Sequence, residues 1–155
     1  MTTQLAFDLG HRTALGADDF LVAPCNQAAV AWLDRWPEWP APALTIHGPK
    51  GCGKTHLAHV WRSRTNARFI AVAELGGLSP YDLLEESNAC IVDDVGNAGF
   101  DEAALFHLYN AARDTGGHIL LTAETAPSAW PLTLDDLRSR LVAAPTVAVG
   151  APDDS

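Results

Sequence analysis

A glycine-rich segment in the first half of the chain constrains its fold more than any other feature. Residues 48–55 read Gly-Pro-Lys-Gly-Cys-Gly-Lys-Thr and match the phosphate-loop pattern G-x-x-x-x-G-K-[ST]. A β-type segment, residues 43–47, precedes this loop, and apolar spacing typical of a helix follows it from His56. The glycines of such a loop turn backbone N–H groups around an anion, and the helix N-terminus adds partial positive charge. The pattern therefore predicts a nucleoside triphosphate site; the alternative is a glycine-rich turn without a ligand.

The loop residues have different expected roles. Lys54 would reach the β- and γ-phosphates, and the Thr55 hydroxyl would bind Mg²⁺. The predicted nucleotide-binding residues of this segment are Gly48, Pro49, Lys50, Gly51, Cys52, Gly53, Lys54, Thr55 and His56.

Composition narrows the possible partners and location. No apolar run of the 155 residues reaches the length of a membrane span, and the first residues lack a basic and apolar leader. We therefore expect a cytoplasmic protein with no membrane contact. The net charge is −9, and from Tyr81 onward thirteen acidic residues accompany three arginines. Because Lys and Arg supply most DNA affinity, we expect no direct sequence-specific DNA binding and assign any role at DNA to a protein partner.

Apolar segments alternate with helical ones along the chain, which predicts an α/β fold. This alternation favours a three-layer αβα sandwich with a mainly parallel sheet, covered by helices on both faces. Residues 1–16 are expected to form an N-terminal arm, and residues 17–155 one nucleotide-binding domain. Expected strands span 43–47, 68–72, 89–94, 118–122 and 146–149, and expected helices 26–36, 56 onward, 79–86, 101–114 and 135–141.

Two carboxylates end the apolar strand predicted at residues 89–94. In a phosphate-loop fold, an acid at the end of a neighbouring strand holds Mg²⁺, and a second acid orients the attacking water. We assign the metal to Asp93 and the water to Asp94, about forty residues beyond Lys54. The alternative is a solvated Asp-Asp turn.

Two further polar segments are candidates for the site. Thr122 and Glu124 lie at the end of the next apolar strand, where a polar group would sense the γ-phosphate. The alternative is a strand that leaves the core through polar residues. Arg138 and Arg140 lie on the last predicted helix, whose spacing turns Leu137 and Leu141 inward. One of these arginines would point outward toward a neighbour's nucleotide; the alternative is a solvated basic pair.

Together these segments resemble the bacterial replication-initiator (DnaA) family of AAA+ ATPases. The likeness is greatest to the family's short regulatory branch, the regulatory inactivators of DnaA (Hda). The matching segments follow in the family's order: Asp19-Phe20-Leu21-Val22 with Asn26, Gly48 to His56, Ile91-Val92-Asp93-Asp94, Phe106-His107-Leu108-Tyr109-Asn110, Leu121-Thr122-Ala123-Glu124 and Leu137-Arg138-Ser139-Arg140-Leu141.

The resemblance implies cofactors and roles for several residues. It implies ATP or ADP with Mg²⁺, and a DnaA initiator as partner. Asp19, Phe20, Leu21 and Val22 would lie near the adenine, and Thr122 to Glu124 would form the sensor-1 region. Arg140 would be an arginine finger for the nucleotide of a neighbour, either the initiator or another copy of this chain. Ala123 departs from a common polar residue of the family, which leaves the sensing atom open.

The N-terminal arm contains a second sequence pattern. Gln4-Leu5-Ala6-Phe7-Asp8-Leu9 is similar to the peptide with which Hda proteins bind the DNA polymerase sliding clamp. In an extended peptide Leu5, Phe7 and Leu9 share one side and would enter apolar pockets, while Gln4 offers an amide. A tail without a partner is the alternative. By this resemblance the protein would be nucleoid-associated through the clamp.

Two departures from the family affect the predicted function. No helix-turn-helix segment follows, so the initiator's own DNA binding is not expected. The chain also stops at residues 151–155, where the family continues into a helical lid with a sensor-2 arginine. We therefore expect the lid to be absent, which puts tight ATP binding and self-sufficient hydrolysis in doubt.

Three functions follow as hypotheses. The first is an Hda-like regulator that binds the clamp and stimulates hydrolysis of initiator-bound ATP through Arg140. The second is an autonomous phosphate-loop ATPase or kinase that uses Lys54, Asp93 and Asp94. The third is a nucleotide-bound adaptor of the DnaA family that does not hydrolyse ATP.

Overall fold

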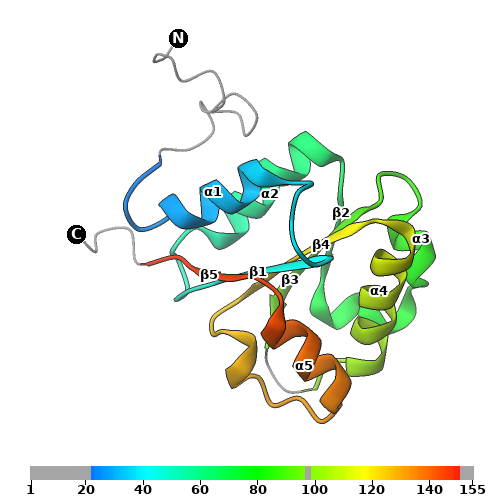
Figure 1. Ribbon diagram of the computed structural model, residues 1–155. Helices are drawn as coiled ribbons and strands as arrows, with labels where there is room; N and C mark the ends of the chain where they lie inside the picture. The colour runs from blue at the N-terminus through cyan, green and yellow to red at the C-terminus, as the bar shows by residue number, and fades with distance from the viewer. Residues whose placement is uncertain (1–21, 97–98, 151–155) are drawn as a thin grey trace.

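A computed structural model gives the three-dimensional structure of residues 22–96 and 99–150 (Figure 1). The predicted clamp-binding residues Gln4, Leu5, Phe7 and Leu9 lie outside the described residues. Of the residues assigned to the adenine, Asp19, Phe20 and Leu21 also lie outside them, whereas Val22 is included.

The centre of the domain is a five-stranded sheet in the order β2-β3-β4-β1-β5. All four neighbouring pairs are parallel, which confirms the sheet predicted from the alternating sequence. The strands are β1 (Ala43–His47), β2 (Arg68–Ala71), β3 (Ala89–Val95), β4 (His118–Ala123) and β5 (Thr146–Ala148). The three central strands, β3, β4 and β1, are almost entirely buried, as expected for strands with helices on both faces.

Helices cover both faces of this sheet. In Figure 1, α1 (Gln27–Arg35) and α2 (Lys54–Thr65) lie on one face, and α3 (Pro80–Leu84), α4 (Glu102–Thr115) and α5 (Asp135–Ala143) on the other. The buried residues form two clusters that match this division. Alternate residues of one strand enter opposite clusters: Leu120 packs with α1 and α2, whereas Leu121 packs with α4 and α5. The αβα sandwich predicted from sequence is therefore confirmed.

Several local details differ from the sequence expectation. Two short 3₁₀ helices, Val72–Gly77 and Pro127–Ala129, were not predicted, and the first begins at Val72, which the sequence had assigned to the end of the strand at 68–72. The first begins directly after β2, where the Glu74 carboxylate accepts a hydrogen bond from the Ala71 N–H at 3.0 Å. Asn26 precedes α1, but its side chain accepts from the Ala23 N–H and makes no capping bond to the helix.

Tryptophan rings pack in the layer beside α1 and α2. The Trp39 and Trp61 rings stack with centroids 5.5 Å apart, and Trp36 meets Trp61 edge to face at 5.8 Å. Trp61 is fully buried. Trp36 and Trp39 therefore pack against the interior of this layer.

Within the described ranges, no helix has both the length and the apolar character needed to cross a membrane.

Candidate nucleotide-binding site

The glycine-rich loop follows β1 at the carboxyl edge of the sheet, between β4 and β5. Gly48 needs its lack of a side chain, because a Cβ there would lie 2.1 Å from the Val149 carbonyl oxygen. Gly53, immediately before α2, has φ +96°, a conformation that favours glycine. The first N–H groups of a helix have no partner within the helix, so the start of α2 suits an anion. The predicted strand–loop–helix unit is thus formed.

Backbone carbonyl groups of the loop hold the Lys54 side chain beside it. Its ammonium Nζ donates to the Gly48 carbonyl at 2.6 Å and to the Pro49 carbonyl at 3.2 Å. Cys52 is buried, with its Sγ 4.0 Å from the same nitrogen. The amine therefore lies at the loop, where phosphate oxygens would replace or share these carbonyl acceptors.

The Asp93 carboxylate lies where three elements meet. Its Oδ1 accepts hydrogen bonds from the Thr55 hydroxyl of α2 at 3.3 Å and from the Thr122 hydroxyl of β4 at 2.6 Å. The structure therefore brings together both residues predicted to hold the metal, Thr55 and Asp93. Thr122 is only 1% exposed, so it reaches Asp93 from the protein interior.

A bulge at the end of β3 sets the directions of the two carboxylates. The register with β4 shifts between Val92 and Val95, and Asp94 takes a left-handed conformation with φ +65°. The Asp94 N–H donates to the Thr122 hydroxyl at 2.9 Å, while its side chain is exposed. Thr122 thus bonds both to the backbone of the bulge and to the Asp93 carboxylate. The Asp93 side chain faces Thr122 and Thr55, whereas the Asp94 side chain faces solvent.

These residues fit a hydrated magnesium ion bound with phosphates. Mg²⁺ prefers oxygen ligands and is commonly held by one or two protein side chains together with substrate phosphates and water. The Thr55 hydroxyl and Asp93 Oδ1 supply adjacent oxygens beside the predicted phosphate position. When bound, the ion would neutralise developing phosphate charge; Thr55 and Asp93 would hold it, and Asp94 would be free to orient water.

Glu124 lies at the same edge of the sheet and pairs with a loop residue. Its carboxylate is 3.7 Å from the Lys50 ammonium, and the two side chains are 45% and 87% exposed. Such an exposed pair contributes little to stability. It links the loop to the end of β4, and sequence reasoning named both residues without foreseeing their contact.

His47 is a site residue that the motif search missed. It ends β1 directly before the loop, and burial, with a smaller effect from the positive charge of Lys54, lowers its pKa below 6.5. The imidazole next to the loop is therefore uncharged at neutral pH. Its position immediately before the motif was the only signal in the sequence.

The two arginines of α5 have different surroundings. Arg138 donates to the carbonyls of Trp130 and Leu132, which fixes it to its own chain. Arg140 is half-buried with its guanidinium carbon 6.0 Å from the Phe106 ring centroid. Leu137 and Leu141 are buried, as the helical spacing predicts.

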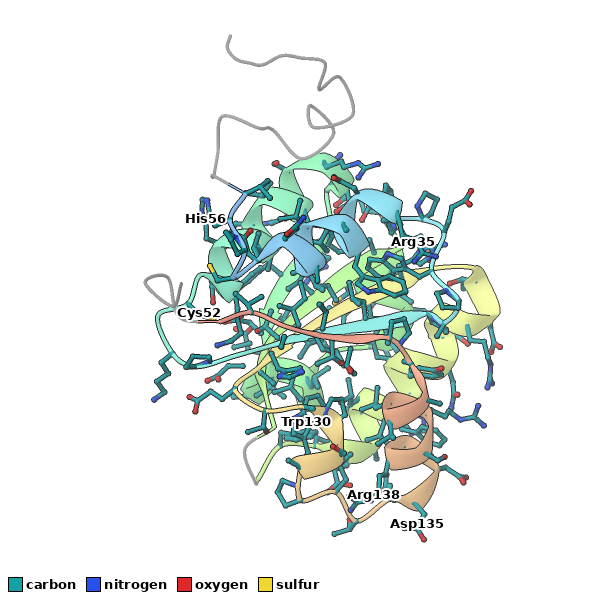
Figure 2. The ribbon with its side chains drawn as sticks, turned by 60° about the vertical axis from the view of Figure 1, so that its left-hand side comes forward. Arg35, Cys52, His56, Trp130, Asp135 and Arg138 are labelled. Carbon is teal, nitrogen blue, oxygen red and sulfur yellow. The ribbon has the colours of Figure 1, made fainter. Side chains whose placement is uncertain are left out.

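Both arginines belong to a helix that lies away from the phosphate loop. In Figure 2, Cys52 and His56 mark the loop and the start of α2, whereas Asp135 and Arg138 of α5 lie at another end of the molecule. His56 and Val22 are exposed.

No family model matches the chain. The chromosomal replication initiator protein DnaA of Caulobacter vibrioides (strain NA1000 / CB15N) is 30% identical over 81% of this chain and 31% of that protein. The chain thus spans about a third of the length of the curated initiators it matches.

Solved structures share the fold. Domain III of the Thermotoga maritima replication initiation protein DnaA has a TM-score of 0.72 and 23% identity, over 91% of this chain and 69% of that one. The AMPPCP-bound DnaA from Aquifex aeolicus has a TM-score of 0.69 and 19% identity, with coverages of 92% and 51%. At these identities the likeness establishes the αβα architecture.

Proposed function

The chain is a DnaA-related AAA+ domain, and from that premise we propose that it is an adenine-nucleotide-binding regulator of replication initiation. In this proposal it acts as the Hda branch does. It binds the sliding clamp, approaches the DnaA initiator and stimulates hydrolysis of the ATP that the initiator holds.

The contact among Thr55, Asp93 and Thr122 carries the nucleotide part of the proposal. These residues come from α2, β3 and β4, and their meeting beside a complete phosphate loop is what magnesium-assisted triphosphate binding requires. The Aquifex relative was solved with AMPPCP, an adenine nucleotide analogue, which supports ATP or ADP as the ligand here.

The position of Arg140 supports action on a partner's nucleotide. Its helix lies away from this chain's own phosphate loop, and its guanidinium carbon lies 6.0 Å from the Phe106 ring centroid. Because a guanidinium supplied by a neighbour stabilises the charge of a transferred phosphoryl group, Arg140 would serve the initiator's site or that of a second copy. Gln4, Leu5, Phe7 and Leu9 would hold the protein on the clamp.

The test measures hydrolysis of ATP bound to the initiator in the presence of DNA-loaded clamp. Wild-type protein should accelerate hydrolysis, and Arg140→Ala should lose most of that acceleration, since finger arginines contribute on the order of a thousandfold in rate. Arg113→Ala is the matched control because Arg113 is an exposed arginine on α4.

The two parts of the proposal fail separately. Full stimulation by Arg140→Ala would contradict the finger mechanism while leaving a scaffolding regulator. Absence of stimulation by wild type, with nucleotide binding intact, would favour the adaptor function instead.

A further inference from the structure

A groove of about 720 Å³ lies at the side of the domain away from the phosphate loop. Figure 1 shows α2 running from that loop toward β2, and the groove forms where α2 ends and β2 begins. Its walls come from the last turns of α2, the start of β2 and the segment before β3. The residues important for its chemistry are His59, Arg62, Ser63, Asn66, Arg68 and Glu86.

Two guanidinium groups of this groove have no polar partner. Within residues 22–96 and 99–150, neither the Arg62 side chain nor the Arg68 side chain forms a hydrogen bond or an ion pair. By contrast, Arg64 of the same helix donates to the carbonyls of Leu33 and Trp36. Arg62 lies in the last turn of α2, where its positive charge interacts favourably with the helix dipole. Arg68 lies outside the helix and does not interact with the dipole in this way.

The surroundings of these arginines differ from the rest of the protein. Residues 39–73 contain no Asp or Glu and five of the ten Lys and Arg residues, in a chain with a net charge of −9. A negatively charged ligand would be repelled by most of the surface and attracted to this part of it.

We propose that this groove binds a short acidic peptide segment of a partner protein, through carboxylates that pair with Arg62 and Arg68. An arginine guanidinium binds a carboxylate through two parallel N–H bonds. Such a charged pair is stronger than a hydrogen bond between neutral groups. β2 is an edge strand, with only β3 beside it in the sheet. Its outer edge offers backbone groups to an extended chain.

Other features of the groove favour a peptide over single-stranded nucleic acid. Nucleic-acid grooves combine a continuous basic track with aromatic faces on which bases stack. Here the His59 ring stacks on Phe69 with centroids 4.3 Å apart, and the Arg62 guanidinium lies 5.8 Å from the same centroid. The Phe69 ring therefore has protein neighbours already. Glu86 lies on the opposite wall and interrupts the positive charge, so the groove has no continuous basic track.

The experiment is an NMR titration of the isotope-labelled full chain with the capped peptide Asp-Val-Glu-Val-Asp-Val. We expect amide shifts concentrated in residues 59–68 and 86–87, and binding that weakens as salt increases. Arg62→Glu and Arg68→Glu should each raise the dissociation constant about tenfold or more, because each removes a charge-assisted pair. Arg113→Glu makes the same change in net charge at an exposed α4 residue that does not line this groove, and it should leave binding unchanged.

Additional variants and a second ligand decide between the possible outcomes. Arg62→Gln and Arg68→Gln replace any variant whose amide spectrum shows that it has not folded, and they should weaken binding in the same direction. The proposal is overturned if the peptide shifts no groove amides at millimolar concentration, or if Arg113→Glu weakens binding as much as the groove variants. Oligo-dT that binds more tightly than the peptide, with the same dependence on Arg62 and Arg68, would instead establish a nucleic-acid site.

Discussion

At the scale of single residues, the site depends on where Lys54 and Thr122 place their polar groups. The ammonium of Lys54 bonds to the Gly48 and Pro49 carbonyls, so its charge lies at the loop in the absence of any ligand. The Thr122 hydroxyl, buried in β4, accepts from the Asp94 N–H and donates to Asp93. One residue thus supplies charge for phosphate, and the other orients the carboxylate expected to hold the metal.

Lys54→Ala should weaken adenine-nucleotide binding at least about tenfold. A charge-assisted contact to phosphate contributes about 1.5–3 kcal/mol, and alanine removes it. The measurement is titration calorimetry with ATP and ADP at high ligand concentration. Lys50→Ala is the control, because Lys50 is 87% exposed and pairs with Glu124; its effect should be smaller. Equal affinity of wild type and Lys54→Ala would refute the phosphate-loop assignment.

Thr122→Val should reduce the Mg²⁺-dependent part of nucleotide affinity. The change removes the hydroxyl that orients Asp93, and loss of such an outer-sphere partner typically costs about 10–100-fold in metal affinity. Thr122→Ser keeps the hydroxyl and should restore the affinity. Binding measured with Mg²⁺ and with EDTA separates this effect from general destabilisation, which would lower both values. A Val variant with an unchanged ratio of the two affinities would show that Thr122 does not act through Asp93.

At the scale of elements, Glu102 connects two helices on the same face of the sheet. This residue opens α4, and its carboxylate accepts from the backbone N–H groups of Thr133 and Leu134 at 2.9 and 3.0 Å. Both donors come directly before α5, the helix of Arg138 and Arg140. The hydrogen bond from Leu134, followed by those from Thr133, lowers the pKa of Glu102 below 4.5.

The lowered pKa of Glu102 makes a contribution to stability that depends on pH. Protonation is more favourable in the unfolded chain, so the contribution is present above about pH 4.5 and is lost as pH falls through the lower folded-state pKa. Glu102→Gln should therefore lower the Tm at pH 7, with the difference from wild type shrinking at acidic pH. Because the group is accessible to solvent, we expect less than about 1 kcal/mol.

Thermal unfolding monitored by circular dichroism between pH 3 and 7 measures this effect. Glu85→Gln, an exposed neutralisation at the end of α3, is the control and should follow the wild-type curve. A constant difference between wild type and Glu102→Gln over this range would rule out the carboxylate linkage.

At the scale of the whole molecule, the nucleotide site and the N-terminal arm are expected to act separately. The described domain has its own two clusters of buried residues, one on each face of the sheet. An extended arm would add little to this core, whereas a few apolar anchors carry most of the affinity of a peptide interface.

The triple variant Gln4→Ala, Leu5→Ala and Phe7→Ala should therefore lose binding to the sliding clamp while keeping the wild-type Tm nearly unchanged. Surface plasmon resonance with immobilised clamp measures the first effect, and calorimetry the second. Retention of wild-type clamp affinity by this variant would show that the arm does not carry the interaction.

The sequence by itself determined the elements and the loop of this protein. The glycine pattern around Lys54 and the alternation of apolar strands with helices are local signals, and both predict structure from neighbours in the chain. The same signals placed Asp93 at a strand end and turned Leu137 and Leu141 inward.

Only the tertiary structure decided which distant groups meet. The bonds that Asp93 accepts from Thr55 and Thr122 depend on the strand order and on a bulge in β3, and the bond from the Leu134 N–H to the Glu102 carboxylate joins the start of α5 to α4. The sequence also could not distinguish Arg138, which bonds to backbone carbonyls, from Arg140, which lies over Phe106. Local preferences act over a few residues, whereas the bonds of Asp93 and Glu102 join residues 29 to 38 positions apart through packing and strand register, which no short pattern encodes.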